Sequence, residues 1–144
     1  MKRKLVLTLL VIAFAISIAP HSSIEAAEVG GLDNGKVYML RNASTGKYLN
    51  PHMGYDVDET NVYQWTYDGS VEQTFKLTYK ENTDSYLISS MSSSNGNNRV
   101  LDIVKSSGSV VSGCNVQIYR PVDPVAQEWK IIYVSSGRYK IVPR

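Results

Sequence analysis

Polar and aromatic side chains interrupt two short apolar runs in the second half of the chain. Asp102 lies within the run Val-Leu-Asp-Ile, and Gln127 opens the segment Gln-Glu-Trp. Gln117 and Tyr119 lie between them, within the run Val-Gln-Ile-Tyr. Carboxylate and amide groups exchange hydrogen bonds with hydroxyls, and a flat aromatic ring packs against the C–H face of a pyranose. This combination of side chains is typical of a saccharide-binding site.

A weaker copy of the same pattern occurs earlier in the chain. Gln127 follows Gln73 by 54 residues, and Val116 follows Val62 by the same 54. An internal period of this length indicates a repeat architecture. The counterpart site residues of the first copy are Asn50, Trp65, Glu72 and Gln73.

The motifs Leu-Asp-Ile, Val-Gln-Ile-Tyr and Gln-x-Trp, in this order, resemble one repeat of the ricin B-type lectins, a β-trefoil family. The resemblance runs from about residue 36 to the end of the chain. It implies that Asp102 hydrogen-bonds vicinal sugar hydroxyls and that Gln117 holds its carboxylate in place. It further implies that Tyr119 stacks on the sugar ring and that Gln127 contacts another hydroxyl. The expected ligands are galactose-type or related glycans and polysaccharides.

The chain departs from the family pattern in both copies. The residue before Gln127 is often Asn in the family but is Ala126 here, so one expected hydrogen bond, worth about 1 kcal/mol, is missing. In the first copy a neutral Asn50 replaces the acid, and Tyr63 stands at the position of Gln117. A neutral amide accepts hydrogen bonds less strongly than a carboxylate. We therefore expect the first copy to be the weaker site.

Each candidate also has a purely structural interpretation. Asp102 is placed to form a turn hydrogen bond with Ser106 or Ser107. Gln127 is suited to bind buried backbone groups instead of a sugar. Trp129 is expected in the core, because a large aromatic ring is mostly buried in folded proteins.

Residues 1–27 have the layout of a secretory signal peptide. Three basic residues precede an apolar run over residues 5–19, and small residues follow up to Ala26 and Ala27. The alternative is an uncleaved anchor, but fifteen apolar residues are short for a membrane span of about 20. We expect a secreted protein with no membrane span in the mature chain, in which residues 28–35 form a linker.

Charge and cysteine content narrow the class of protein further. The full chain has 15 basic and 13 acidic residues, and removing residues 1–27 takes away three basic residues and Glu25. The remaining 12 basic and 12 acidic residues leave no excess charge for a polyanion, so nucleic acid is not an expected partner. Cys114 is the only cysteine, so the chain has no internal disulfide and depends on apolar packing.

Alternating apolar residues and turn signals divide residues 36–144 into short strands. We predict strands at residues 36–41, 47–49, 61–66, 73–79, 85–88, 99–103, 115–120, 127–134 and 138–142. They form one four-strand repeat over about 36–84, a second over 85–137, and a truncated third from 138. The predicted fold is therefore an all-β, ricin-type β-trefoil that is incomplete.

Two repeats and one strand are not expected to close the barrel of a trefoil, and they leave strand edges unpaired. The sequence leaves three explanations open. The chain is a truncated product, a second copy or a partner chain completes its barrel, or the barrel is irregular and open.

Catalytic signatures are scarce. Outside the leader the only histidine is His52, and no nucleophile elbow, metal-ligand spacing or phosphate-binding loop occurs. A glycosidase needs two carboxylates at a defined separation, and nothing in the sequence places Asp102 beside Asp123. The acidic stretch with Asp56 and Asp58 lacks the ligand order of a calcium loop and is expected to be solvated. No enzyme activity, cofactor or metal is expected.

Three functions are consistent with these patterns. The first is a secreted, non-catalytic carbohydrate-binding module. The second is a trefoil-like protein-interaction or toxin-associated subunit whose sugar sites have decayed, as Ala126, Asn50 and Glu72 suggest. The third is a truncated, non-functional fragment.

Overall fold

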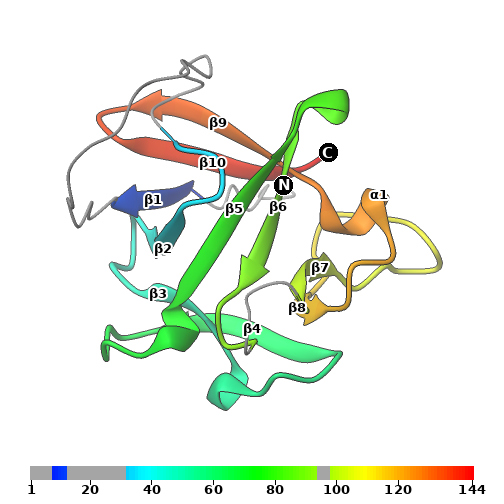
Figure 1. Ribbon diagram of the computed structural model, residues 1–144, viewed down its shortest axis with the longest axis horizontal. Coiled ribbons are helices and arrows are strands. Elements are labelled where there is room, and N and C mark those ends of the chain that lie inside the picture. Colours follow the sequence, from blue (N-terminus) through cyan, green and yellow to red (C-terminus); the bar gives the residue numbers. More distant parts are fainter. Residues whose placement is uncertain (1–7, 13–31, 94–97) are drawn as a thin grey trace, which may run out of the picture.

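The computed structural model describes residues 8–12, 32–93 and 98–144, and it has an all-β fold (Figure 1). Its strands are β1 (Thr8–Ile12), β2 (Val37–Asn42), β3 (Tyr48–Pro51), β4 (Thr60–Trp65), β5 (Thr74–Lys80), β6 (Ser85–Ser90), β7 (Val100–Ile103), β8 (Val116–Tyr119), β9 (Trp129–Ser135) and β10 (Arg138–Pro143). The short helices are η1 (His52–Gly54), η2 (Val71–Gln73), η3 (Glu81–Thr83) and α1 (Pro124–Gln127). The nine predicted strands are all present, and β1 is an additional strand.

Six strands form a closed ring of antiparallel pairs. Their order around the ring is β1, β10, β9, β6, β5 and β2, and β2 pairs again with β1. The two repeats and the single strand of the third unit do not close this ring by themselves, because residues 8–12, within the predicted leader, supply the sixth strand (Figure 1). Leu9 is the register partner of Tyr139 on one side and of Asn42 on the other. The rest of the predicted leader lies outside the described residues.

Two hairpins extend from this ring, one from each repeat. β3 and β4 form the hairpin of the first unit, and β7 and β8 form that of the second. The two hairpins are joined because β4 also pairs with β8. Asn61 and Asn115, which are 54 residues apart, meet at this junction, where Asn115 Nδ2 donates to Asn61 Oδ1 at 2.7 Å. The third unit contributes β10 alone to the described structure.

The core lies inside the barrel and beneath the hairpins. In β2, Tyr38 and Leu40 are buried while Val37 is exposed, as the alternation of the sequence predicts. Trp129 is also buried, and its indole Nε1 donates to the carbonyl oxygen of Leu101 at 3.0 Å. The residues with no exposed surface include Leu40, Phe75, Leu77, Ile88 and Ile118. Trp129 thus belongs to the core, as its structural interpretation predicts.

The glutamine of each Gln-x-aromatic motif precedes its strand and does not lie on it. Gln127 ends α1, and β9 begins at Trp129. Gln73 ends η2, and β5 begins at Thr74. The prediction that both strands open at the glutamine is wrong by one or two residues. Because each glutamine ends a short helix, its side-chain amide contacts the loop that precedes that helix.

Candidate functional site

The β7–β8 hairpin brings three of the predicted sugar-binding residues onto one face. Asp102 lies directly opposite Gln117, and Val100 lies opposite Tyr119. Residues two apart on a strand point to the same face, so Tyr119 shares the face of Gln117 and Asp102. The opposite face carries Ile118, which has no exposed surface. The spacing in the sequence is therefore converted into one shared face, on which Asp102 and Val100 are buried and Gln117 and Tyr119 are half-buried.

Asp102 is held by the residue that the family resemblance assigns to it. Gln117 Nε2 donates to Asp102 Oδ2 at 2.7 Å, and Asp102 is only 6% exposed. Burial raises the pKa of the Asp102 carboxyl, while hydrogen bonds from Gln117 and Gln127 partly oppose the rise. The nearby charge of Asp123 raises this pKa further. The carboxylate is thus oriented and largely shielded from water.

Asp123, considered above as a second carboxylate, already has partners. Its Oδ1 accepts from the backbone N–H of Val125 at 3.1 Å and thereby caps α1. Its Oδ2 forms an ion pair with Lys105, and this hydrogen-bonded contact lowers the pKa of Asp123. Asp123 therefore serves the turn that leads into α1.

Tyr119 is half-buried beside a basic residue. The guanidinium carbon of Arg120 lies 5.6 Å from the centre of the Tyr119 ring, which is the geometry of a cation–π contact. Arg120 Nε is in turn paired with Asp58 Oδ2 at 3.1 Å. The ring is accordingly positioned by its neighbours.

Gln127 and Gln73 make equivalent contacts with the loops that precede them. Gln127 Oε1 accepts from the N–H groups of Val122 and Asp123 at 2.8 and 2.9 Å, and its Nε2 donates to Arg120 O at 2.9 Å. Gln73 Oε1 accepts from Asp68 N at 3.2 Å, and its Nε2 donates to Thr66 O at 2.8 Å. Both side chains close a loop, as the structural interpretation of Gln127 predicts. Direct contact of either amide with a sugar stays a prediction.

The β3–β4 hairpin of the first unit has the same register but different side chains. Asn50 lies opposite Tyr63, and Tyr48 lies opposite Trp65. Asn50 is 5% exposed, and its Nδ2 donates to Pro51 O at 2.7 Å. Its Oδ1 is buried and has no hydrogen-bond partner. A buried acceptor without a partner is costly, so a group beyond the described side chains is expected to satisfy it.

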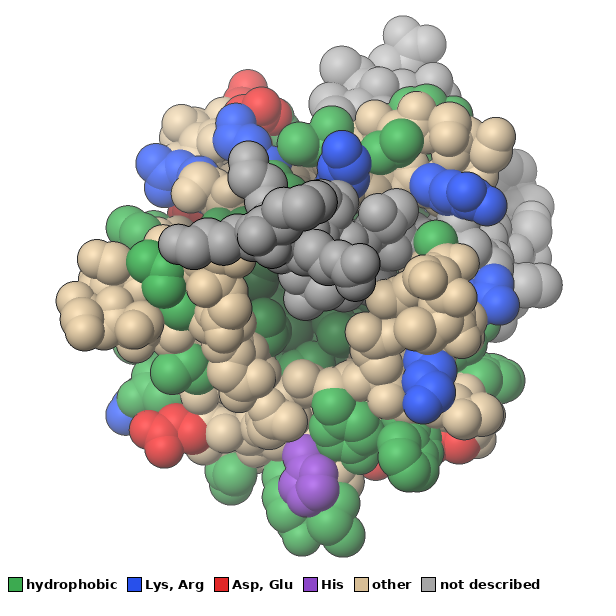
Figure 2. Space-filling view, turned by 180° about the vertical axis from the view of Figure 1, so that it is seen from behind, with side chains coloured by type: hydrophobic (Ala, Val, Ile, Leu, Met, Phe, Trp, Pro, Cys, Tyr) green, Lys and Arg blue, Asp and Glu red, His purple; other side chains and the backbone are tan. Residues whose placement is uncertain are grey.

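Four rings form a connected row beside Asn50. The ring centres of Tyr55 and His52 are 5.9 Å apart, those of His52 and Tyr63 5.6 Å, and those of Tyr63 and Trp65 5.7 Å. Trp65 and Tyr55 are 52% and 51% exposed. On the face shown in Figure 2, hydrophobic side chains gather around the histidine at the lower edge. The repeat pattern predicts only Trp65 of this row as a site residue, although all four ring-bearing residues are evident in the sequence.

Glu72 covers the turn that carries this row. A Cβ atom added to Gly54 would overlap the side-chain carboxylate of Glu72. Gly54 also has a positive φ of 66°, a conformation that favours glycine. The carboxylate of Glu72 therefore lies against the turn between His52 and Tyr55. Glu72, a predicted member of the first-unit site, thus lies beside the end of the row that His52 and Tyr55 form.

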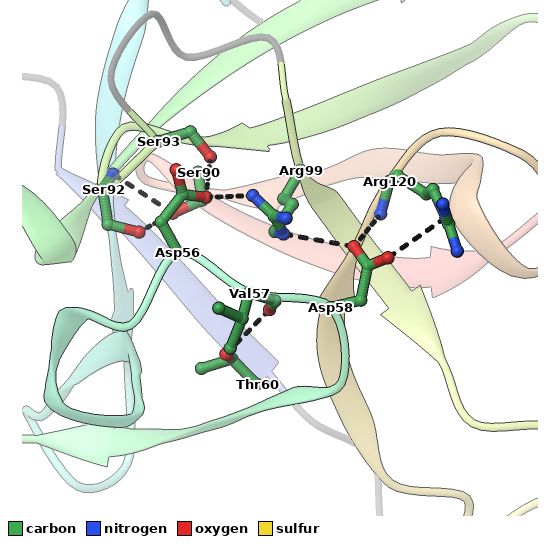
Figure 3. A network of polar contacts seen from close by, with 9 residues as sticks. All are labelled: Asp56, Val57, Asp58, Thr60, Ser90, Ser92, Ser93, Arg99 and Arg120. Atoms are coloured by element: carbon green, nitrogen blue, oxygen red, sulfur yellow. Dashed lines mark hydrogen bonds and ion pairs between the residues drawn. The ribbon is translucent and has the colours of Figure 1, made fainter.

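A network of ion pairs joins this turn to the second unit (Figure 3). Arg99 Nη1 contacts Asp56 Oδ1 at 2.6 Å, and Arg99 Nε contacts Asp58 Oδ1 at 3.1 Å. Ser93 Oγ donates to Asp56 Oδ1 at 2.6 Å. The side chains of Asp56 and Asp58 are only 29% and 24% exposed, so the expectation of a solvated acidic loop is wrong. Arg99, 43 residues from Asp56, makes the loop part of the folded body.

Other features of the described residues do not add to these sites. A recess of about 370 Å³ lies in the loop between β7 and β8, lined in part by Lys105 and Cys114, and contains none of the predicted site residues. Within the part of the chain that the structure describes, no three His, Cys, Asp or Glu side chains are grouped to hold a metal ion. The same residues include no helix of the length and apolarity that crossing a membrane requires.

Comparisons with known proteins support this architecture. The Rhizoctonia solani agglutinin has a TM-score of 0.61 and 20% identity over 85% of this chain and 71% of its own. The designed three-fold symmetric protein ThreeFoil has a TM-score of 0.50 and 20% identity over 84% of this chain and 69% of its own. At this identity the two likenesses concern the fold alone. A comparison with curated proteins gives no match.

The sequence match agrees with the architecture. Residues 28–109, more than half of the chain, match the family described as ricin-type beta-trefoil lectin domain-like. This range contains the whole β3–β4 hairpin and also β7. The match and the barrel with its hairpins show that this chain belongs to the ricin-type β-trefoil lectin-like domain family.

Proposed function

We propose that the protein is a secreted, non-catalytic carbohydrate-binding module that recognises galactose-type sugars or related glycans. The observation that carries this proposal is the hydrogen bond from Gln117 to Asp102, on the same face as Tyr119. Membership of the lectin-like family supports the same conclusion. An oriented carboxylate accepts strong, charge-assisted hydrogen bonds from hydroxyls, and the adjacent ring packs against the sugar's apolar face.

The two hairpins supply two sites of different character. The second-unit site is small and mainly polar, while the first-unit site presents exposed rings. Sites of this kind bind single sugars weakly and gain retention when several act together on one glycan. Ala126 is buried in α1, so the amide that the family often places there is absent and weak binding of a single sugar is expected.

Retention of the protein on immobilised galactose tests the second-unit site. We expect Asp102→Ala to abolish retention while the far-UV circular dichroism spectrum is unchanged. Asp84→Ala is the matched control, since the Asp84 side chain is 70% exposed and lies in the turn after η3. Equal retention of wild type, Asp102→Ala and Asp84→Ala would remove Asp102 from the site.

A protein-interaction role is the alternative function. The unusual residues Ala126 and Asn50 favour it, because each replaces a group that the family resemblance assigns to sugar binding. A glycan array without a signal, together with a specific protein partner that binds the β3–β4 face, would replace the lectin proposal by this one.

A further inference from the structure

We infer that the first unit binds an extended, neutral glycan chain along the row of rings from Trp65 to Tyr55, and not one terminal sugar. This inference rests on the proposed carbohydrate-binding function and names the ligand class of the first-unit site. It assigns binding roles to Tyr63, His52 and Tyr55. The family resemblance places the stacking ring of the first unit at Trp65 and assigns no sugar contact to these three residues.

The spacing of the rings fits consecutive sugar residues. Successive ring centres along the row are 5.6 to 5.9 Å apart, the spacing of packed aromatic pairs, so the four rings form one continuous strip that is longer than a single pyranose. Tyr63 and Trp65 are two residues apart on β4 and share a face, while His52 and Tyr55 continue the row past the end of β3. A monosaccharide would contact one or two of these rings and leave the others exposed to water.

The buried carbonyl of Asn50 is a second, independent indication of a ligand. Asn50 Oδ1 has no partner in the structure, and Asn50 lies directly across the hairpin from Tyr63 in the middle of the row. A hydroxyl of a sugar stacked on this part of the row would supply the missing hydrogen bond. Exposed rings alone would fit many apolar ligands, but rings beside an unsatisfied amide oxygen favour one that carries hydroxyls.

The angles between the rings define the form of the glycan. Neighbouring rings are inclined by 75°, 60° and 87° along the row, so they do not form a flat platform. A crystalline polysaccharide presents a flat surface and requires coplanar rings, whereas a single soluble chain can turn from one ring to the next. The surface therefore fits a soluble chain.

The charge beside the row selects against acidic glycans. Glu72 lies against Gly54 in the turn between His52 and Tyr55, and its carboxylate would repel a uronate or sulfate group. Arg99, the cation closest to this turn in the polar network, is already paired with Asp56 and Asp58. A neutral chain avoids this repulsion and can donate its hydroxyls to Glu72.

Binding to soluble galactan oligosaccharides of one to six residues tests the inference. With the full chain carrying Asp102→Asn, which weakens the second-unit site, we expect affinity to rise with length up to about four residues. Tyr55→Ala should lower the affinity for the longer oligosaccharides about three- to tenfold, the value of one aromatic contact. Tyr133→Ala is the matched control, because Tyr133 on β9 is 53% exposed and Tyr55 is 51% exposed.

Two results would overturn the inference while leaving the proposed function intact. One is an affinity that does not depend on oligosaccharide length, and the other is equal behaviour of Tyr55→Ala and Tyr133→Ala. Tyr55→Leu, which keeps the apolar bulk but removes the ring, separates loss of stacking from loss of the loop's fold. If wild type bound neither galactose nor any oligosaccharide, the proposed function and this inference would both fail.

Discussion

The two hairpins share one backbone plan but use it for different chemistry. At the same place in the register, the first unit pairs Asn50 with Tyr63 and the second pairs Asp102 with Gln117. The second unit buries a carboxylate and satisfies it with an amide, whereas the first leaves a buried amide oxygen unsatisfied and exposes rings. The difference teaches that a repeat can keep its strands and loop contacts while its binding face changes from hydrogen bonding to stacking.

The largest effect is expected from opening the barrel that holds both hairpins. If residues 1–27 are removed on export, β2 and β10 lose β1 as their partner. We expect the chain of residues 28–144 to melt at a lower temperature than the full chain and to self-associate through these edges. Size-exclusion mass and thermal melting measure both. An unchanged melting temperature and a monomeric mass would show that the two units do not depend on β1.

The next largest effect is expected at the two loop-closing glutamines, where the units are most alike. Gln127→Ala leaves two partly buried N–H groups and one carbonyl without their partner and should lower the free energy of unfolding by about 2–4 kcal/mol. Gln73→Ala removes two such bonds and should cost somewhat less. Urea denaturation measures both, with Gln64→Ala as the control, since Gln64 contacts only an exposed hydroxyl in the hydrogen bonds described. Equal, near-zero effects would contradict the shared role.

A smaller effect is expected where the units are joined. Arg99→Ala removes the cation shared by Asp56 and Asp58 and should lower the free energy of unfolding by about 1–3 kcal/mol. Arg120→Ala should have a much weaker effect, because the Arg120 side chain is 65% exposed. The loop that contains Asp56 and Asp58 also carries Tyr55. Arg99→Ala should therefore also weaken binding of long oligosaccharides. If Arg99→Ala lost binding but kept its free energy of unfolding, the ion pairs would position the loop without stabilising the fold.

The smallest effect is a dependence of stability on pH that arises from the buried carboxyl of the second unit. Burial raises the pKa of Asp102, so the folded state holds this proton more tightly than the unfolded state does. The contribution to stability is present below the unfolded pKa and is lost as the pH rises through the folded pKa. We therefore expect Asp102→Asn to gain stability relative to wild type as the pH rises through this range. Asn50→Asp would introduce the same dependence into the first unit, and parallel pH profiles of wild type and Asp102→Asn would contradict this assignment.

The sequence alone was sufficient for nine of the ten described strands, the repeat and the family. Alternation is a local pattern that places Val37 on the opposite face of its strand from Tyr38 and Leu40, and in the structure Val37 is exposed while the other two are buried. The order of the motifs around Asp102, Gln117 and Tyr119 placed them on one hairpin face, because strand register converts spacing into position. The exact start of β9 was missed, since the short helix ending at Gln127 leaves no periodic signal.

Contacts between distant residues decided the rest, and no local pattern contains them. The closure of the barrel by β1, the pairing of Arg99 with Asp56 and the unsatisfied Asn50 carbonyl depend on which segments meet in space. The row of rings likewise exists because the turn after β3 folds back beside β4, which places His52 against Tyr63. Residue types and spacing therefore determined the family of this protein, while tertiary packing determined what each hairpin offers to a ligand.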